Sequence, residues 1–212
     1  MWPWKKSNTT EPYKEIIPNS FPISLRKDVE KVIAILPLPK KVFYQFRDPI
    51  GIDNLIHMNT RPVILEKEEL NIPMRMYFNE PAAEQEEILT DLQKVILNCF
   101  YLRHHNGFIR QKRLALLINK TEYFIIPFTF QLLGEYVIEI LETLELQINS
   151  TTVENYVKFI QENKKYTMQT ESRMISYWNS YYRQRFPKLK QYIGTNIFDR
   201  LKKANAQHCI AE

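Results

Sequence analysis

The residues with the clearest capacity for chemistry lie between positions 103 and 110, in the stretch RHHNGFIR. Its two adjacent histidines, His104 and His105, could ligate a metal ion or carry protons. Zinc needs three or four ligands, however, and neighbouring residues on a helix point about 100° apart, so one ion rarely takes both. The other potential ligands, all distant in the sequence, are His57, His208, Cys99 and Cys209. We therefore predict neither a metal site nor a cofactor.

A cysteine–histidine nucleophile pair is a second interpretation of this stretch. Cys99 precedes the histidines, but it falls on the apolar face of ILNCFYL, where a thiol is usually inert. We therefore predict no catalytic residue here. In the structural interpretation, residues 103–105 are a helix end whose charges complement the helix dipole, Asn106-Gly107 is a left-handed turn, and Ile109 begins the next helix.

Arg110 raises a separate question, because it lies on the same side of its predicted helix as Leu114 and Leu117. A guanidinium at the edge of an apolar face needs a partner. Glu135 and Glu139 lie four residues apart on a predicted helix and could supply one. We expect a structural ion pair between Arg110 and one of these two carboxylates.

The same carboxylates also permit an enzyme hypothesis. Two glutamates one helical turn apart can act as general acid and base or as metal ligands. A di-metal helical bundle would need Glu-x-x-His pairs, and the sequence has none. The enzyme hypothesis then requires the fold to bring Glu135, Glu139, His104 and Arg110 into one cleft.

The elements that must position these residues are mostly helices, as apolar residues recur at helical spacing from residue 79 onward. We expect a mainly α fold of stacked antiparallel helical hairpins, with an irregular arm, a short helix and short strands over 1–78 and a helical domain over 79–212. Asn79 is the expected cap of the longest helix. The expected helices are 24–36, 79–105, 108–118, 127–148, 150–165, 172–186 and 192–203, and the expected strands are 63–65 and 74–78.

The stretch NGFIRQKRLALL is similar to the turn and second helix of HEAT-type repeats. The matching residues are Asn106, Ile109, Arg110 and Leu117, whereas Arg113 stands where the family usually has alanine. The likeness covers one repeat, roughly residues 84–118. It implies a binding scaffold with a concave interaction surface rather than a particular chemistry.

Composition narrows the function classes. The chain has 212 residues with a formal charge of +5, aromatic residues make up 13%, and only four residues are glycine. The sequence contains neither GxGxxG nor GxxxxGK[ST], so a nucleotide-binding loop is not predicted. No stretch reaches the length of an uncharged membrane span and the cysteines form no disulfide pattern, so we expect a cytoplasmic protein.

A basic, aromatic region occupies the last quarter of the chain. Residues 155–203 contain eleven Lys or Arg against three acids, together with ten aromatic residues. Such a mixture suits an acidic protein partner or single-stranded nucleic acid, with Tyr181, Arg183, Arg185, Lys188 and Lys190 as the binding residues. The alternative is a plain amphipathic helix, with a buried stripe and solvated arginines. The stripe would be Ile175, Trp178, Tyr182 and Phe186.

Three functions follow from these features. The one we favour is a non-catalytic scaffold or adaptor that binds another protein, because the sequence shows no catalytic constellation. The second is a nucleic-acid-binding accessory protein that uses the basic region. The third is the helical carboxylate–histidine enzyme described above.

Overall fold

The computed structural model describes residues 16–37 and 60–211, with side chains as far as residue 208. Over these ranges the protein is mainly helical with one small antiparallel sheet, which confirms the expected mainly α class with a small β-containing part. The stacking of helical hairpins stays a prediction. The strands are β1 (Thr60–Leu65) and β2 (Glu68–Pro73). The helices are α2 (Arg26–Ile35), α3 (Ala83–Glu87), α4 (Asp91–Tyr101), α5 (Gly107–Ala115), α6 (Ile126–Gln131), α7 (Ile138–Gln147), α8 (Val153–Glu162), α9 (Lys164–Tyr177) and α10 (Ile193–Ala211).

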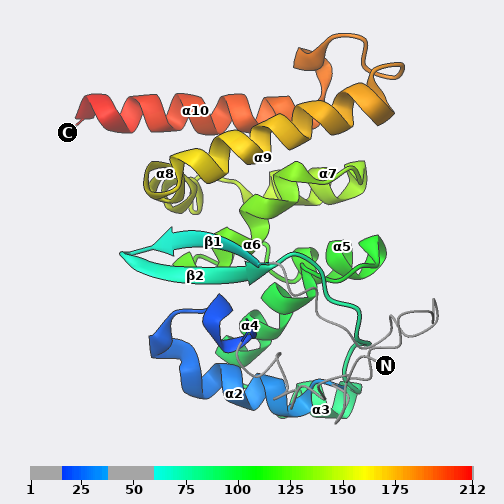
Figure 1. Cartoon of the computed structure of the whole chain (residues 1–212), viewed down its shortest axis with the longest axis vertical. Coiled ribbons are helices and arrows are strands. Elements are labelled where there is room, and N and C mark those ends of the chain that lie inside the picture. Colours follow the sequence, from blue (N-terminus) through cyan, green and yellow to red (C-terminus); the bar gives the residue numbers. More distant parts are fainter. Residues whose placement is uncertain (1–15, 38–59, 212) are drawn as a thin grey trace, which may run out of the picture.

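The elements are stacked along the long axis of the molecule (Figure 1), with α2 and α3 at one end and α9 and α10 at the other. The hairpin lies between these ends. α2 packs on α4, α4 on α5, α5 on α7, and α8 on α10. One cluster of buried apolar side chains contains both Ile17 from the N-terminal part and Phe198 from α10. The segments on either side of the predicted boundary at residue 78 therefore share a core.

The hairpin places its strands differently from the prediction. Leu70 and Ile72 in β2 are 1% and 0% exposed, so the alternating pattern that builds the second strand begins before residue 74. Glu66 and Lys67 form the turn with positive φ values of 52° and 75°, which match the twist of a two-residue hairpin. The predicted strand at 74–78 is wrong, because the ladder ends at Pro73.

The predicted helix over 79–105 is divided into α3 and α4. Thr90 begins α4 with a capping box, in which Thr90 Oγ1 accepts from the Gln93 backbone N–H at 3.3 Å. Gln93 Oε1 accepts in return from the Thr90 N–H at 3.1 Å. The prediction that Asn79 caps this helix is therefore wrong, because Thr90 is the cap.

The predicted helix over 127–148 is also interrupted. The 3-10 turn Leu132–Gly134 follows α6, and the backbone of Glu135 is then extended, with φ −104° and ψ 160°. α7 starts only at Ile138. Glu135 and Glu139 therefore do not share a helix, and the expected spacing of one helical turn between them is wrong. The break coincides with the burial of Glu135 among arginines, described below.

Asn163 sets the boundary between α8 and α9, where the sequence had suggested helices over 150–165 and 172–186. Its side-chain Oδ1 accepts from the Ile64 N–H at 2.7 Å, and its Nδ2 donates to the Ile64 carbonyl at 2.7 Å. The helix break thus contacts the free edge of β1. α9 then continues into the π-helical turn Trp178–Tyr182, and α10 extends beyond the predicted end at 203.

Candidate interaction site

Glu135 is the centre of a buried ion-pair network. Its carboxylate, in a residue 3% exposed, accepts two hydrogen bonds of 3.0 Å from the Arg75 guanidinium. Arg110 Nη2 lies 3.3 Å and Arg103 Nη1 4.0 Å from the two oxygens. Of the two carboxylates considered for Arg110, Glu135 is the one in contact, whereas Glu139 is exposed on α7 and joins no ion pair among the described residues.

The network keeps its charges despite burial. Burial by itself raises the pKa of the Glu135 carboxyl. The charge and hydrogen bonds of Arg75, together with the charges of Arg110 and Arg103, lower this pKa by more, so that it lies below its ordinary value. Burial lowers the pKa of Arg103 to about 9, with part of the effect offset by Glu135. All four groups are therefore charged at neutral pH, and three cations share one anion.

Two of these arginines also fasten the backbone. Arg103 Nε donates to the Pro73 carbonyl at 3.1 Å and its Nη2 to the Met74 carbonyl at 2.7 Å, which holds the end of β2. Arg110 Nη1 donates to the carbonyls of His104 and His105 at 2.6 and 2.8 Å. The network therefore joins the end of β2, the turn between α4 and α5, and the segment before α7.

His104 is a structural residue in this turn. Its Nδ1 accepts from the Asn106 N–H at 3.0 Å, so its Nε2 carries the proton and donates to the Phe78 carbonyl at 3.1 Å. Burial, with the nearby His105, lowers the pKa of His104 to about 4. The ring is neutral at neutral pH, and the prediction that it complements a helix dipole as a cation is wrong.

Asn106 and Gly107 differ from the predicted left-handed turn. The backbone of Asn106 has φ −77° and ψ 120°, and no described glycine has a positive φ. Asn106 instead caps α5, because its Oδ1 accepts from the Phe108 N–H at 2.9 Å. The direct cap explains why α5 begins immediately after the turn.

A third buried arginine, Arg113, was missed as a functional residue by the sequence interpretation. It is 2% exposed and pairs with both Glu80 and Glu86, with Nε 2.6 Å from Glu80 Oε1 and Nη1 2.8 Å from Glu86 Oε2. Its Cζ lies 4.9 Å from the centre of the Tyr101 ring. The available signal was its spacing of three from Arg110, which places both on neighbouring faces of one helix.

Tyr136 follows Glu135 directly and lies on the outside of the molecule. Its ring centre is 5.7 Å from that of Tyr177 and 5.6 Å from that of Tyr181, and the last two are 6.0 Å apart. Tyr136 is 45% and Tyr181 63% exposed. Tyr182 Oη donates to the Tyr136 carbonyl at 2.5 Å. The buried network on one side and Tyr182 on the other therefore hold this tyrosine triad in place.

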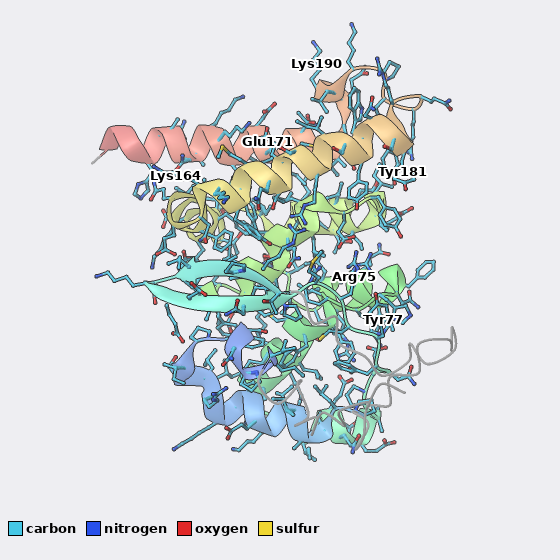
Figure 2. The ribbon with its side chains drawn as sticks, in the orientation of Figure 1. Arg75, Tyr77, Lys164, Glu171, Tyr181 and Lys190 are labelled. Atoms are coloured by element: carbon cyan, nitrogen blue, oxygen red, sulfur yellow. The ribbon has the colours of Figure 1, made fainter. Side chains whose placement is uncertain are left out.

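Four exposed cations follow Tyr181 in the sequence, namely Arg183, Arg185, Lys188 and Lys190. They belong to the connection from α9 to α10, and Figure 2 shows Tyr181 and Lys190 at the same end of the molecule. We call Tyr136, Tyr177, Tyr181 and these four cations the tyrosine–basic surface. The five predicted binding residues are all exposed, and their role in binding stays a prediction. Tyr136 was missed because only the fold brings it next to α9.

The stripe considered as the alternative for this part of the chain is only partly buried. Ile175 is 37% exposed, and the remaining three members are only partly buried. α9 instead buries Tyr166, Thr170 and Met174, at spacings of four. The rings assigned to the stripe, Trp178, Tyr182 and Phe186, pack against the edge of the main core.

The described residues contain no group of three or more histidine, cysteine or acidic residues that could hold a metal ion. Cys99 is fully buried, and burial raises the pKa of its thiol well above the ordinary value. His57 and the Cys209 side chain lie outside the described residues. Within the same ranges, none of the helices combines the length and the apolar character needed to cross a membrane.

None of the protein-family models, curated proteins or solved structures with which the chain was compared matches it. The class of the protein is therefore defined by its own fold and site. It is a mainly helical protein in which a buried arginine–glutamate network is joined, through Glu135, to the exposed Tyr136 of the tyrosine triad.

Proposed function

We propose that the protein is a non-catalytic scaffold that binds an acidic segment of another protein through the tyrosine–basic surface. The observation that carries this proposal is the contact of three tyrosine rings next to a connection with four exposed cations. Tyrosine and arginine are enriched at protein interfaces, where they supply most of the binding energy.

The charge of the surface defines the partner. The stretch between Trp178 and Tyr192 holds four cations and no acidic residue. A partner segment with several carboxylates gains from this potential, both in its rate of association and in its register. Aromatic or apolar side chains between those carboxylates would pack on the exposed ring of Tyr181, which is 63% exposed.

Preorganisation supports the same function. The chain on either side of the Tyr136 ring is held by the Glu135 ion pairs and by the Tyr182 hydrogen bond. A ring that is ordered before binding loses little conformational entropy when a partner arrives. The buried network therefore contributes to binding without touching the partner.

The HEAT-like hairpin is part of the proposal. α4 and α5 pack against each other and are joined by a short turn, as in the helical pair of such a repeat. Arg113 remains a departure, because it forms the ion pairs described above at the position where alanine would pack. The repeat would act as the rigid support of the interaction surface.

Binding of single-stranded nucleic acid is the second candidate, and the same rings favour it, since they could stack on bases while the cations contact phosphates. Gel retardation of a 20-nucleotide oligothymidine and of a matched duplex, over a series of salt concentrations, tests it. Binding that weakens steeply with salt and is reduced in Tyr181→Ala supports this candidate. Absence of salt-dependent binding removes it.

Panning a peptide display library on the full chain tests the protein-binding function. The double variant Tyr181→Ala/Arg183→Gln serves as the negative target, and Leu146→Ala, which alters a side chain 61% exposed elsewhere, is the matched control. We expect enrichment of acidic peptides with aromatic residues that bind the wild type and the control but not the double variant. Peptides that bind all three proteins equally would contradict the assignment of this surface.

A further inference from the structure

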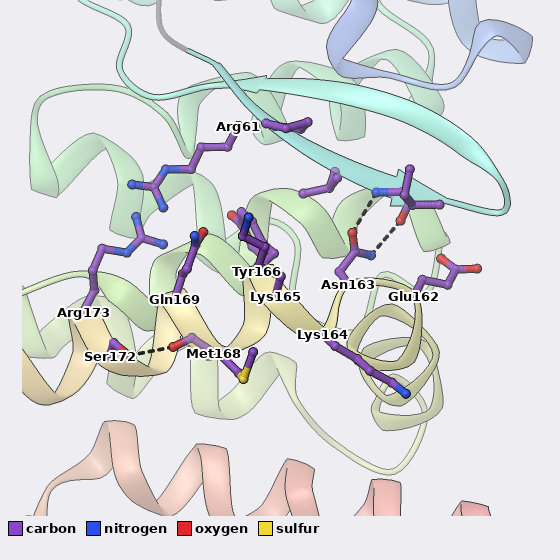
Figure 3. A pocket seen from close by; sticks show the side chains of 13 residues that line it. Arg61, Glu162, Asn163, Lys164, Lys165, Tyr166, Met168, Gln169, Ser172 and Arg173 are labelled. Carbon is purple, nitrogen blue, oxygen red and sulfur yellow. Dashed lines mark hydrogen bonds between the residues drawn. The ribbon is translucent and has the colours of Figure 1, made fainter.

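A second possible ligand site lies between the edge of β1 and the first turns of α9. The structure has a cavity there of about 980 Å³, within the range of small-molecule sites. It is lined by residues 61–64 of β1 and by residues from Glu162 to Arg173 (Figure 3). None of these residues belongs to the tyrosine–basic surface.

The cavity is strongly basic. Four of its lining residues are cations and one is an acid. The acid, Glu162, is held by neutral donors, with its Oε2 2.8 Å from Tyr123 Oη and 3.3 Å from the Glu66 nitrogen. The cations are Arg61, Lys164, Lys165 and Arg173. An anion that enters this cavity meets an excess of positive charge.

Two of the cations converge. The guanidinium groups of Arg61 and Arg173 point toward each other from the two walls (Figure 3), and neither forms an ion pair with any carboxylate of the described residues. Burial and the charge of Arg61 lower the pKa of Arg173. Each guanidinium presents a planar fork of N–H donors that suits phosphate or carboxylate oxygens, and here two such groups face the same space.

The inner wall holds buried polar atoms without partners. Tyr166 is 6% exposed and lies beside Arg173, yet neither its Oη nor Arg173 Nε makes a well-aligned hydrogen bond in the described part of the chain. Arg173 Nη2 donates to Thr170 Oγ1 at 3.0 Å. Buried polar groups are normally satisfied, and a bound group can provide the missing partner. Glu135 does not provide it, because its carboxylate is shared by the other three arginines. This cavity therefore has donors in excess of acceptors.

The free edge of β1 argues against an added peptide strand. Pro62 has no backbone N–H, and the N–H and carbonyl of Ile64 are both hydrogen-bonded to Asn163. A peptide that paired with this edge would find few backbone partners. The side chains, rather than the strand edge, are left to bind a ligand.

We propose that this cavity binds a small molecule that carries a phosphate group on an apolar or aromatic body. The phosphate lies between Arg61 and Arg173, and the body lies against Pro62, Ile64 and Met168. A phosphate monoester carries close to two negative charges at neutral pH, which suits the surplus of cations better than a single carboxylate.

Isothermal titration calorimetry of the full chain with phenyl phosphate at pH 8 tests this site, with inorganic phosphate, phenol and benzoate titrated separately. We expect phenyl phosphate to bind more tightly than inorganic phosphate, because the ring adds apolar contact, and more than about tenfold more tightly than phenol or benzoate. Arg61→Gln and Arg173→Gln should each weaken phenyl phosphate at least about tenfold. The exposed Lys31→Gln on α2, with the same change of charge, should leave it unchanged.

Thermal unfolding of each variant shows that it is folded, and Arg61→Gln alone decides the result if Arg173→Gln does not fold. Four results would overturn the proposal: no binding of phenyl phosphate, equal binding by wild type and Arg61→Gln, equal loss in Lys31→Gln, or benzoate binding as tight as phenyl phosphate. Displacement of phenyl phosphate by an eight-nucleotide oligothymidine of higher affinity would assign the cavity to nucleic acid instead.

Discussion

Arg110 Nη2 lies 3.3 Å from Glu135 Oε2, and the two side chains are 1% and 4% exposed. The contact joins the first turn of α5 to the extended segment before α7. Because Tyr136 follows Glu135 immediately, the same contact fixes where the tyrosine triad begins. Stability and the interaction surface are therefore linked through one buried ion pair.

Arg110→Ala should lower the free energy of unfolding by about 3–5 kcal/mol, because it removes one partner of a buried pair and two backbone hydrogen bonds. Urea unfolding followed by circular dichroism measures this change. Glu139→Ala is the matched control: its side chain is exposed, so we expect a change within about 0.5 kcal/mol. An Arg110→Ala protein as stable as this control would show that the ion pair is dispensable.

The sequence was sufficient to predict the Arg110 ion pair as a choice between two partners, because a charge at the edge of an apolar helix face needs compensation. It could not decide between Glu135 and Glu139, since both suit a continuous helix. The deciding fact is the break between Gly134 and Val137, where Glu135 pairs with Arg75, a residue 60 positions away. Local periodicity carries no information about a contact of that range.

Contacts between residues distant in the sequence also limit the prediction of other features of this chain. The predicted binding residues from Tyr181 to Lys190 are on the surface because their segment is basic and follows the last buried turn of α9. The helix boundary at Asn163 was missed because its cause is a pair of hydrogen bonds to Ile64. Boundaries set by distant partners required the structure, whereas most element types did not, the strand predicted at 74–78 being the exception.

His104 should make the protein less stable in mild acid. Its pKa is about 4 in the folded protein and about 6.5 in the unfolded chain, so between these values the unfolded state binds a proton that the folded state does not. Stability is then full above pH 6.5, falls as the pH drops to about 4, and loses about 3 kcal/mol in total.

Unfolding free energies of wild type and His104→Gln, measured from pH 7 to pH 4, test this dependence. The glutamine cannot titrate, so the difference between the two proteins should shrink as the pH falls. Glu80 and Glu135, whose pKa values are lowered from 4.5, lose their contribution only at lower pH and do so in both proteins. Parallel curves between pH 6.5 and 4 would contradict the buried, neutral assignment of His104.

Arg113→Ala introduces the residue that the HEAT-like pattern would have there. We expect a loss of about 2–4 kcal/mol, because the variant leaves Glu80 and Glu86 without their shared cation and opens space beside Tyr101. Lys112→Ala, which removes a side chain 62% exposed that also contacts Glu80, should cost less than about 1 kcal/mol. Equal thermal unfolding midpoints for the two variants would argue against the Arg113 network.

Asn163→Ala should release β1 from the helices beside it. The variant loses two hydrogen bonds of 2.7 Å to Ile64, and we expect a loss of about 1–3 kcal/mol and faster hydrogen exchange at the Ile64 amide. Gln169→Ala, on the exposed side of α9, serves as the control. If the Ile64 amide exchanges as slowly in Asn163→Ala as in the wild type, the strand is held by other contacts.

The measurement that tests the central claim most directly is the dissociation constant of an acidic, aromatic peptide selected on the wild-type chain, determined for wild type, Tyr181→Ala and Leu146→Ala. The account predicts that Tyr181→Ala weakens binding by about thirtyfold or more, as for a central interface tyrosine, while Leu146→Ala binds like the wild type. Equal dissociation constants for wild type and Tyr181→Ala would contradict the assignment of the tyrosine–basic surface as the binding site.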